Sequence, residues 1–159
     1  MASVWRRFIF RPITGFRVWR LKKQVLDTAT DKFIELLLMI MDLSFYLFKD
    51  DDYQNHLKDS EGRDFKGRYF FRSADEEETI AASAIFENAD MKVGFEAIDD
   101  WDVMVTFENG EALRNYIFSE KQDIFDSISK NAVEVDGNLN HIFKFGFMVQ
   151  DLPRRLGIE

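Results

Sequence analysis

The two histidines are the first residues to consider for chemistry, because the chain contains no cysteine and therefore offers no thiolate nucleophile. His56 lies in a polar stretch, and His141 follows Gly137 in a segment that is otherwise largely apolar. The acidic runs 76–78 and 99–100 have the composition of solvated turns. No nucleophile elbow, paired-histidine zinc motif or phosphate-binding glycine loop occurs. We therefore expect structural or surface roles for both histidines, and no enzymatic activity, cofactor or metal site.

The composition describes a chain that can build a substantial core. It has 159 residues, 46% of them hydrophobic and 17 of them phenylalanine, which is too apolar for a disordered chain. The longest apolar stretch, 33–48, is short for a membrane span and carries Glu35 and Asp42. The absence of cysteine fits a reducing compartment. These features predict a cytoplasmic protein that is soluble or peripheral at a membrane.

The charge is distributed unevenly along the chain. Residues 1–23 hold seven basic side chains and no acid, so the remainder carries 14 basic and 29 acidic groups. This net negative charge on residues 24–159 repels phosphate backbones, and we expect no nucleic-acid partner.

The sequence divides into a basic aromatic segment, 1–25, and a single domain, 26–159. A mixture of cationic and large apolar side chains can lie at a membrane interface or on a partner protein. The residues proposed for such contact are Trp5, Arg6, Arg7, Phe10, Arg17, Trp19 and Arg20. The alternative is that Trp5, Phe8, Phe10, Phe16 and Trp19 pack on the domain itself or on a second subunit.

A long helix is predicted over 28–49, capped by Asp27 or Thr28. Apolar residues recur there at spacings of three and four, and others widen the stripe until most sides of the helix are apolar. We expect more than one neighbour to bury this helix. Residues 50–66 are polar and predict a loop containing one short helical turn.

After residue 66, apolar residues recur at every second position, which predicts strands with one apolar face. The candidate strands are 69–72, 80–86, 91–97 and 101–107, and the short polar links are 73–77, 88–90 and 98–100. Links of this kind are typical of hairpins, so we expect an antiparallel meander.

Helical spacing returns after residue 107. Helices are predicted over 110–118 and 120–130, followed by a strand at 132–136 and a last helix over 139–150. Asp151 is expected to cap a separate final turn that has Pro153 at its start.

This order of elements resembles the sterol carrier protein 2 family over about 67–159. The resemblance is carried by the strand residues 102–107, by Ala112-Leu113, by 123–125 and by the strand-turn 133–138. In that family a strand with the pattern D-x-x-[IVL]-[TS] leads into two helices. An apolar-x-[VI]-x-G-[DN] strand and turn then open the last helix, as Val133 to Asn138 do here.

The resemblance implies an α+β fold: a five-stranded, mostly antiparallel sheet covered on one face by helices, here preceded by the long N-terminal helix. It also implies a non-catalytic lipid-binding or carrier function, with an apolar tunnel for a fatty acyl chain, acyl-CoA or sterol between sheet and helices. The side chains expected to line that tunnel are Ile80, Ala82, Ala84, Ile117, Phe125, Ile128, Leu139, Ile142, Phe143, Phe147 and Met148.

The last predicted helix is apolar around much of its circumference, whereas covering one sheet needs only a narrow stripe. The excess must meet a ligand, the N-terminal helix or a second subunit. The alternative function is therefore a homodimerisation or partner-interaction module without a bound ligand.

Overall fold

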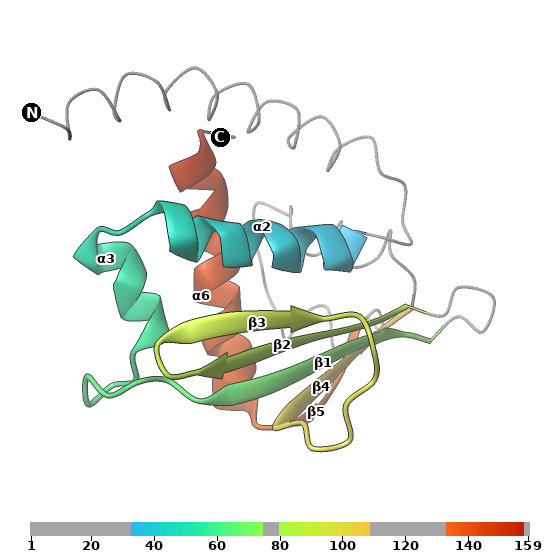
Figure 1. Cartoon of the computed structure of the whole chain (residues 1–159). Helices are drawn as coiled ribbons and strands as arrows, with labels where there is room; N and C mark the ends of the chain where they lie inside the picture. The colour runs from blue at the N-terminus through green and yellow to red at the C-terminus, as the bar shows by residue number, and fades with distance from the viewer. Residues whose placement is uncertain (1–32, 75–79, 109–132, 158–159) are drawn as a thin grey trace, which may run out of the picture.

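The computed structural model describes residues 33–74, 80–108 and 133–157, in which helices cover one face of a five-stranded sheet (Figure 1). The α+β architecture predicted from the sequence is confirmed. None of the helices in these ranges has both the length and the hydropathy to cross a bilayer. The predicted segment 1–25 and the predicted helices 110–118 and 120–130 lie outside the described residues.

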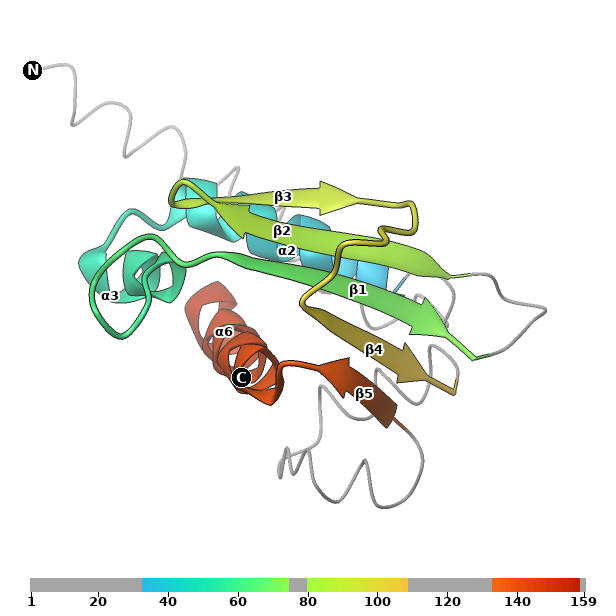
Figure 2. The ribbon, with the colours of Figure 1, turned by 90° about the horizontal axis from the view of Figure 1, so that it is seen from below.

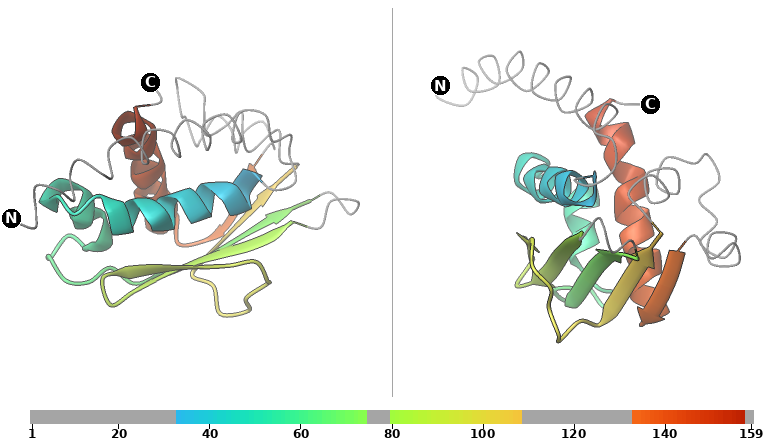
Figure 3. Two further views of the ribbon diagram at one scale, coloured as in Figure 1. Left: turned by 45° about the horizontal axis from the view of Figure 1, so that its top comes forward. Right: turned by 90° about the vertical axis from the view of Figure 1, so that its right-hand side faces the viewer.

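Helix α2 (Phe33–Leu47) lies along β2 and β3 on the helix-covered side of the sheet (Figures 1 and 3). Its inner face buries Ile34, Leu37, Leu38, Ile40, Met41 and Phe45. The carboxyl end is closed by the Gln54 side-chain amide, which donates to the carbonyls of Phe45 and Phe48 at 3.0 and 2.6 Å. These bonds satisfy carbonyls that the end of a helix leaves without a partner.

The polar stretch after α2 was predicted to be a loop with one short helical turn, and it contains two short helical pieces. These are α3 (Asp51–Gln54) and the 3₁₀ turn η1 (Asn55–Leu57). Asp50 caps α3 by accepting a hydrogen bond from the Tyr53 backbone N–H at 3.1 Å.

The strands are β1 (Gly67–Ser73), β2 (Ala81–Glu87), β3 (Asp90–Gly94), β4 (Val103–Phe107) and β5 (Val133–Gly137). Their order in the sheet is β3-β2-β1-β4-β5. The pairs β1–β2, β2–β3 and β4–β5 are antiparallel, and β1–β4 is parallel. The sheet is therefore mostly antiparallel.

The predicted meander is wrong at its last link. Residues 98–100 do not form a hairpin, because the chain leaves the edge strand β3 and crosses below β2 and β1 before entering β4 (Figure 2). Alternation of apolar and polar residues reveals which face of a strand is buried but not which strands are neighbours. Phe70 points away from the helices and is nevertheless buried, which fits a strand at the centre of the sheet.

The predicted turn at 88–90 is confirmed as the tight turn between β2 and β3. Asn88 and Ala89 both have positive φ, at 55° and 56°, which is the backbone of a type I′ hairpin turn. Asn tolerates this conformation, whereas Ala89 adopts it at some energetic cost.

The last helix is continuous. Helix α6 runs from Leu139 to Leu156, so the separate final turn predicted at Asp151 is wrong. Asn138 caps its start, and Gly157 ends it with a left-handed φ of 66°. Pro153 lies inside the helix, one turn from its end, and the Asp151 carboxylate binds basic side chains instead of capping a new helix.

Candidate functional site: the apolar layer beneath the helices

The helix-facing side of the sheet forms a continuous apolar floor. Cross-strand pairing sets Tyr69 beside Ala84 and Val103, and Phe71 beside Ala82 and Val105. Large and small side chains therefore alternate across the central strands. The buried residues of this floor are Tyr69, Phe71, Ala82, Ala84, Phe86, Met91, Val103, Val105, Phe107 and Val133.

Two helices from distant parts of the chain cover this floor. Helix α2 contacts β2 and β3, and α6 contacts β4 and α2 (Figure 3). The α6 side chains that point inward are Ile142, Phe145, Met148, Val149 and Leu152. We call the space between the floor and these two helices, together with the side chains that fill it, the apolar layer.

Phe145 is the main contact between α6 and the central strand. Its ring centroid lies 5.0 Å from that of Phe71 and 5.4 Å from that of Tyr69. The Tyr69 hydroxyl donates to the His141 carbonyl at 2.7 Å, which fixes the first turns of α6 over β1. Burial, with a contribution from Asp102, raises the pKa of Tyr69 above its usual value and keeps the hydroxyl neutral.

The apolar layer is poor in polar groups. Among the described residues no charged side chain is buried, and the buried polar ones are Ser44, Ser83 and Thr106. Ser83 and Thr106 lie on the opposite face of the sheet by register, and Ser44 donates to the Met41 carbonyl at 2.6 Å. A layer of this composition suits contact with aliphatic groups.

A charged network joins α3 to the end of α6. Arg155 donates to Asp151 at 2.8 Å and to both Asp50 oxygens at 2.8 Å, and its guanidinium lies 4.7 Å from the Tyr53 ring centroid. His56 contacts Asp151 at 3.1 Å. Burial raises the pKa of Tyr53 to about 12. Although burial disfavours the Asp151 carboxylate, hydrogen bonds from its basic neighbours outweigh that effect and hold its pKa at about 2.

This network borders an open hollow of about 610 Å³ that includes Asp52, Phe147 and Arg154. Acidic and basic groups both line it, with Arg154 and Arg155 already bound to Asp151. The network therefore serves to hold two helical segments together. The described residues also contain no group of three or more side chains suited to binding a metal ion.

No protein-family model and no curated protein sequence matches the chain. Among solved structures, the sterol carrier protein domain 2 of Helicoverpa armigera superposes with a TM-score of 0.53 at 14% identity, over 77% of this chain and 88% of that one. UbiJ-SCP2, a ubiquinone synthesis protein, gives 0.52 at 14% identity, over 76% and 98%. The fold is that of a sterol carrier protein 2 domain.

Three of the residues that carried the family resemblance, Asp102, Gly137 and Asn138, connect neighbouring strands of the sheet, whereas 112–113 and 123–125 lie outside the described residues. The Asp102 carboxylate accepts from the Arg68 N–H at 2.8 Å, and its carbonyl accepts from the Asn138 N–H at 3.0 Å. A Cβ on Gly137, whose φ is 101°, would stand 2.3 Å from the Asp102 carbonyl oxygen. The motif therefore fastens β4 to both neighbouring strands at the point where α6 begins.

The structure brings together about half of the residues predicted to line a tunnel. Ile80, Ala82, Ala84, Ile142 and Met148 belong to the buried cluster of the apolar layer. Leu139 and Phe147 are exposed, at 47% and 63%, and Phe143 is half-buried. The remaining three residues, Ile117, Phe125 and Ile128, lie outside the described residues.

Several residues of the apolar layer were not among the predicted lining residues. They are Tyr69, Phe71 and Phe145, together with the inner face of α2. The signal for β1 was the run Tyr69-Phe70-Phe71, which is typical of a strand covered on both faces. The α2 residues were placed outside the family match, and the sequence offered the N-terminal helix only as one of three possible neighbours of the last helix.

Proposed function

We propose that the protein is a non-catalytic binding or carrier protein for a hydrophobic ligand, such as a fatty acyl chain, an acyl-CoA or a sterol-like lipid. The observation that carries the proposal is the apolar layer between the sheet and two helices, in a fold shared with a sterol carrier protein domain. Among the described residues, that layer contains no buried charged side chain. A bound lipid chain would therefore not cut off a charged group from solvent.

Two features of the layer support an aliphatic ligand. Ala82 and Ala84 place small side chains on the floor beside large aromatic rings. Met41, Met91 and Met148 are buried in the same cluster, and methionine side chains adapt their shape to irregular partners. Each buried methylene contributes about 0.8 kcal/mol, so ten would supply roughly 8 kcal/mol before the losses of association.

The proposal is tested by titration with a fluorescent long-chain fatty acid. Ala84→Leu adds bulk to the floor of the layer, and Ala81→Leu adds the same bulk on the opposite face of the same strand. Saturable binding by the wild type should weaken about tenfold in A84L, because the added methylenes displace ligand contacts worth roughly 0.8 kcal/mol each. Binding by A81L should match the wild type.

Identical affinities of A84L and A81L would place the ligand elsewhere, and absence of saturable binding by the wild type would refute the function. The alternative, an interaction module without ligand, is favoured by one observation, the exposed apolar side chains of α2. An unliganded protein that forms a stable dimer in the same preparation would support that alternative.

A further inference from the structure

Helix α2 has a second apolar face that points away from the sheet. Its members recur at helical spacing along the whole element, and the exposed ones are large: Met39 is 52% exposed, Leu43 44%, Tyr46 74% and Leu47 42%. With the half-buried Leu36 they form what we call the α2 outer face. A surface helix normally carries polar residues in this position, so an apolar stripe here indicates a binding surface.

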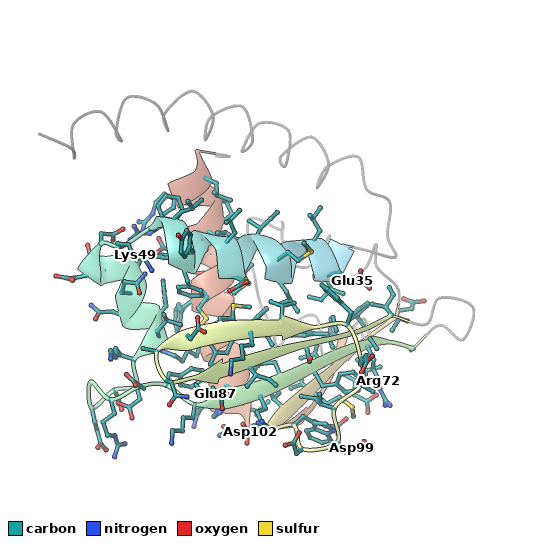
Figure 4. The ribbon with its side chains drawn as sticks, in the orientation of Figure 1. Glu35, Lys49, Arg72, Glu87, Asp99 and Asp102 are labelled. Carbon is teal, nitrogen blue, oxygen red and sulfur yellow. The ribbon has the colours of Figure 1, made fainter. Side chains whose placement is uncertain are left out.

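One edge of the α2 outer face is acidic. Glu35 and Asp42 lie along it, and neither has an ion-pair partner among the described residues; Figure 4 shows Glu35 near the start of α2. Burial, reinforced by the nearby Asp90, raises the pKa of Asp42. Asp42 and Asp90 therefore lie close enough for their charges to interact.

A hollow of about 300 Å³ adjoins this edge, between α2 and the turn from β2 to β3. Leu43, Phe45, Tyr46 and Leu57 contribute apolar surface to it, while Asp42 and Asp90 supply negative charge. Lys49 is also present, but its ammonium donates to the Phe45 carbonyl at 3.0 Å. The chemistry that fits is an apolar or aromatic side chain with a cationic neighbour.

We propose that the α2 outer face and its hollow are the docking surface for the basic aromatic segment 1–23 of the same chain. That segment carries seven basic residues and no acid, and its large apolar residues are Trp5, Phe8, Phe10, Phe16 and Trp19. Its charge and its aromatic content complement the acidic edge and the apolar stripe. The proposal is independent of whether a lipid occupies the apolar layer.

The chain can reach this surface. The nine residues 24–32 separate the segment from α2, and when extended they span about 30 Å. Helix α2 has 15 residues and is about 22 Å long, so the segment can reach any part of it. A tether of this length gives a local concentration on the order of millimolar, which favours this occupant over a separate molecule.

Charge disfavours the other occupants. An anionic membrane would meet Glu35, Asp42 and Asp90, which repel it. In a two-fold dimer the same surface patch contributes from both subunits, so a second copy would bring its own acidic edge to this one.

Limited trypsin digestion of the full chain tests the proposal, with cleavage after Arg17 and Arg20 followed by mass spectrometry. Docking should protect these sites, and Leu43→Glu combined with Tyr46→Glu should accelerate cleavage about tenfold, because proteolysis tracks the undocked population. Asp42→Lys should act in the same direction through charge alone. Phe147→Glu, which alters an equally exposed apolar residue on α6, is the matched control and should leave the rate unchanged.

The outcomes are distinguishable. Protection that is independent of protein concentration and is lost in L43E/Y46E and in D42K supports the proposal. Equal cleavage of all variants overturns it. Protection that disappears on dilution assigns the surface to a second copy, and protection that requires vesicles containing phosphatidylglycerol assigns the segment to a membrane; either result also overturns it.

Discussion

Helices α2 and α6 cover the same face of the sheet and differ on the sides that they turn to solvent. The outward side of α6 mixes the exposed Leu139 and Phe147 with Asn140, Gln150 and Arg154. The α2 outer face is apolar along its length, with two acids at its edge, and α2 contains no basic residue. The inner faces explain the fold in both helices, but only α2 presents a surface whose composition requires a further partner.

The largest expected effect is on the free energy of unfolding, and it distinguishes the buried faces of α2 and α6 from their exposed faces. Phe145→Ala on α6 should lower the free energy of unfolding by about 3–5 kcal/mol, and Leu38→Ala on α2 by about 2–5 kcal/mol, because each leaves a cavity in the apolar layer. Phe147→Ala and Leu43→Ala should each change it by only about 0.5 kcal/mol. Urea unfolding followed by circular dichroism measures all four.

A large loss of stability in L43A would contradict the division of α2 into an inner face for folding and an outer face for docking. A small loss in F145A would mean that α6 is not held by its aromatic contacts with β1.

A smaller, pH-dependent effect is expected where α6 meets α3. Asp151 has a folded-state pKa of about 2, below its ordinary value of 3.8, so its ionisation stabilises the fold above the ordinary value. Asp151→Asn should lower the free energy of unfolding at neutral pH by about 1–2 kcal/mol, and the difference should vanish as the pH falls from about 4 to about 2. Urea unfolding across this range gives the profile.

Asp51→Asn is the control for D151N, because Asp51 is an exposed carboxylate of α3. A constant difference between the wild type and D151N over the whole pH range would contradict the ionic role of the network.

The sequence revealed most of what depends on local pattern. Alternation located β2, β3, β4 and β5, the aromatic run 69–71 located β1, and helical spacing located α2 and α6. The parallel pairing of β1 with β4 could not be read from alternation, since it depends on which strand lies at the centre and on a link that crosses the sheet. The adjacent rings of Phe70 and Phe71, buried on opposite faces, indicate that β1 is a central strand but do not identify its neighbours.

For the same reason, the sequence identified only some of the residues of the candidate site. Ala82, Ala84 and Met148 lie in the apolar layer because their own periodicity points them inward. Phe147 shares the apolar character of its neighbours but is exposed, since position around α6 and not hydrophobicity decides which side chains face the sheet. The part played by α2 depends on a tertiary contact that no local pattern records.

Native mass spectrometry of the purified full chain tests most directly whether the apolar layer accommodates a lipid. We expect the folded 18.8 kDa protein to carry an adduct in the mass range of fatty acids, acyl-CoA or sterols, and to lose it on denaturation. Added long-chain fatty acid should replace the adduct one for one. Detection of only the unliganded chain, both as purified and after long-chain fatty acid is added, would contradict the proposed lipid binding.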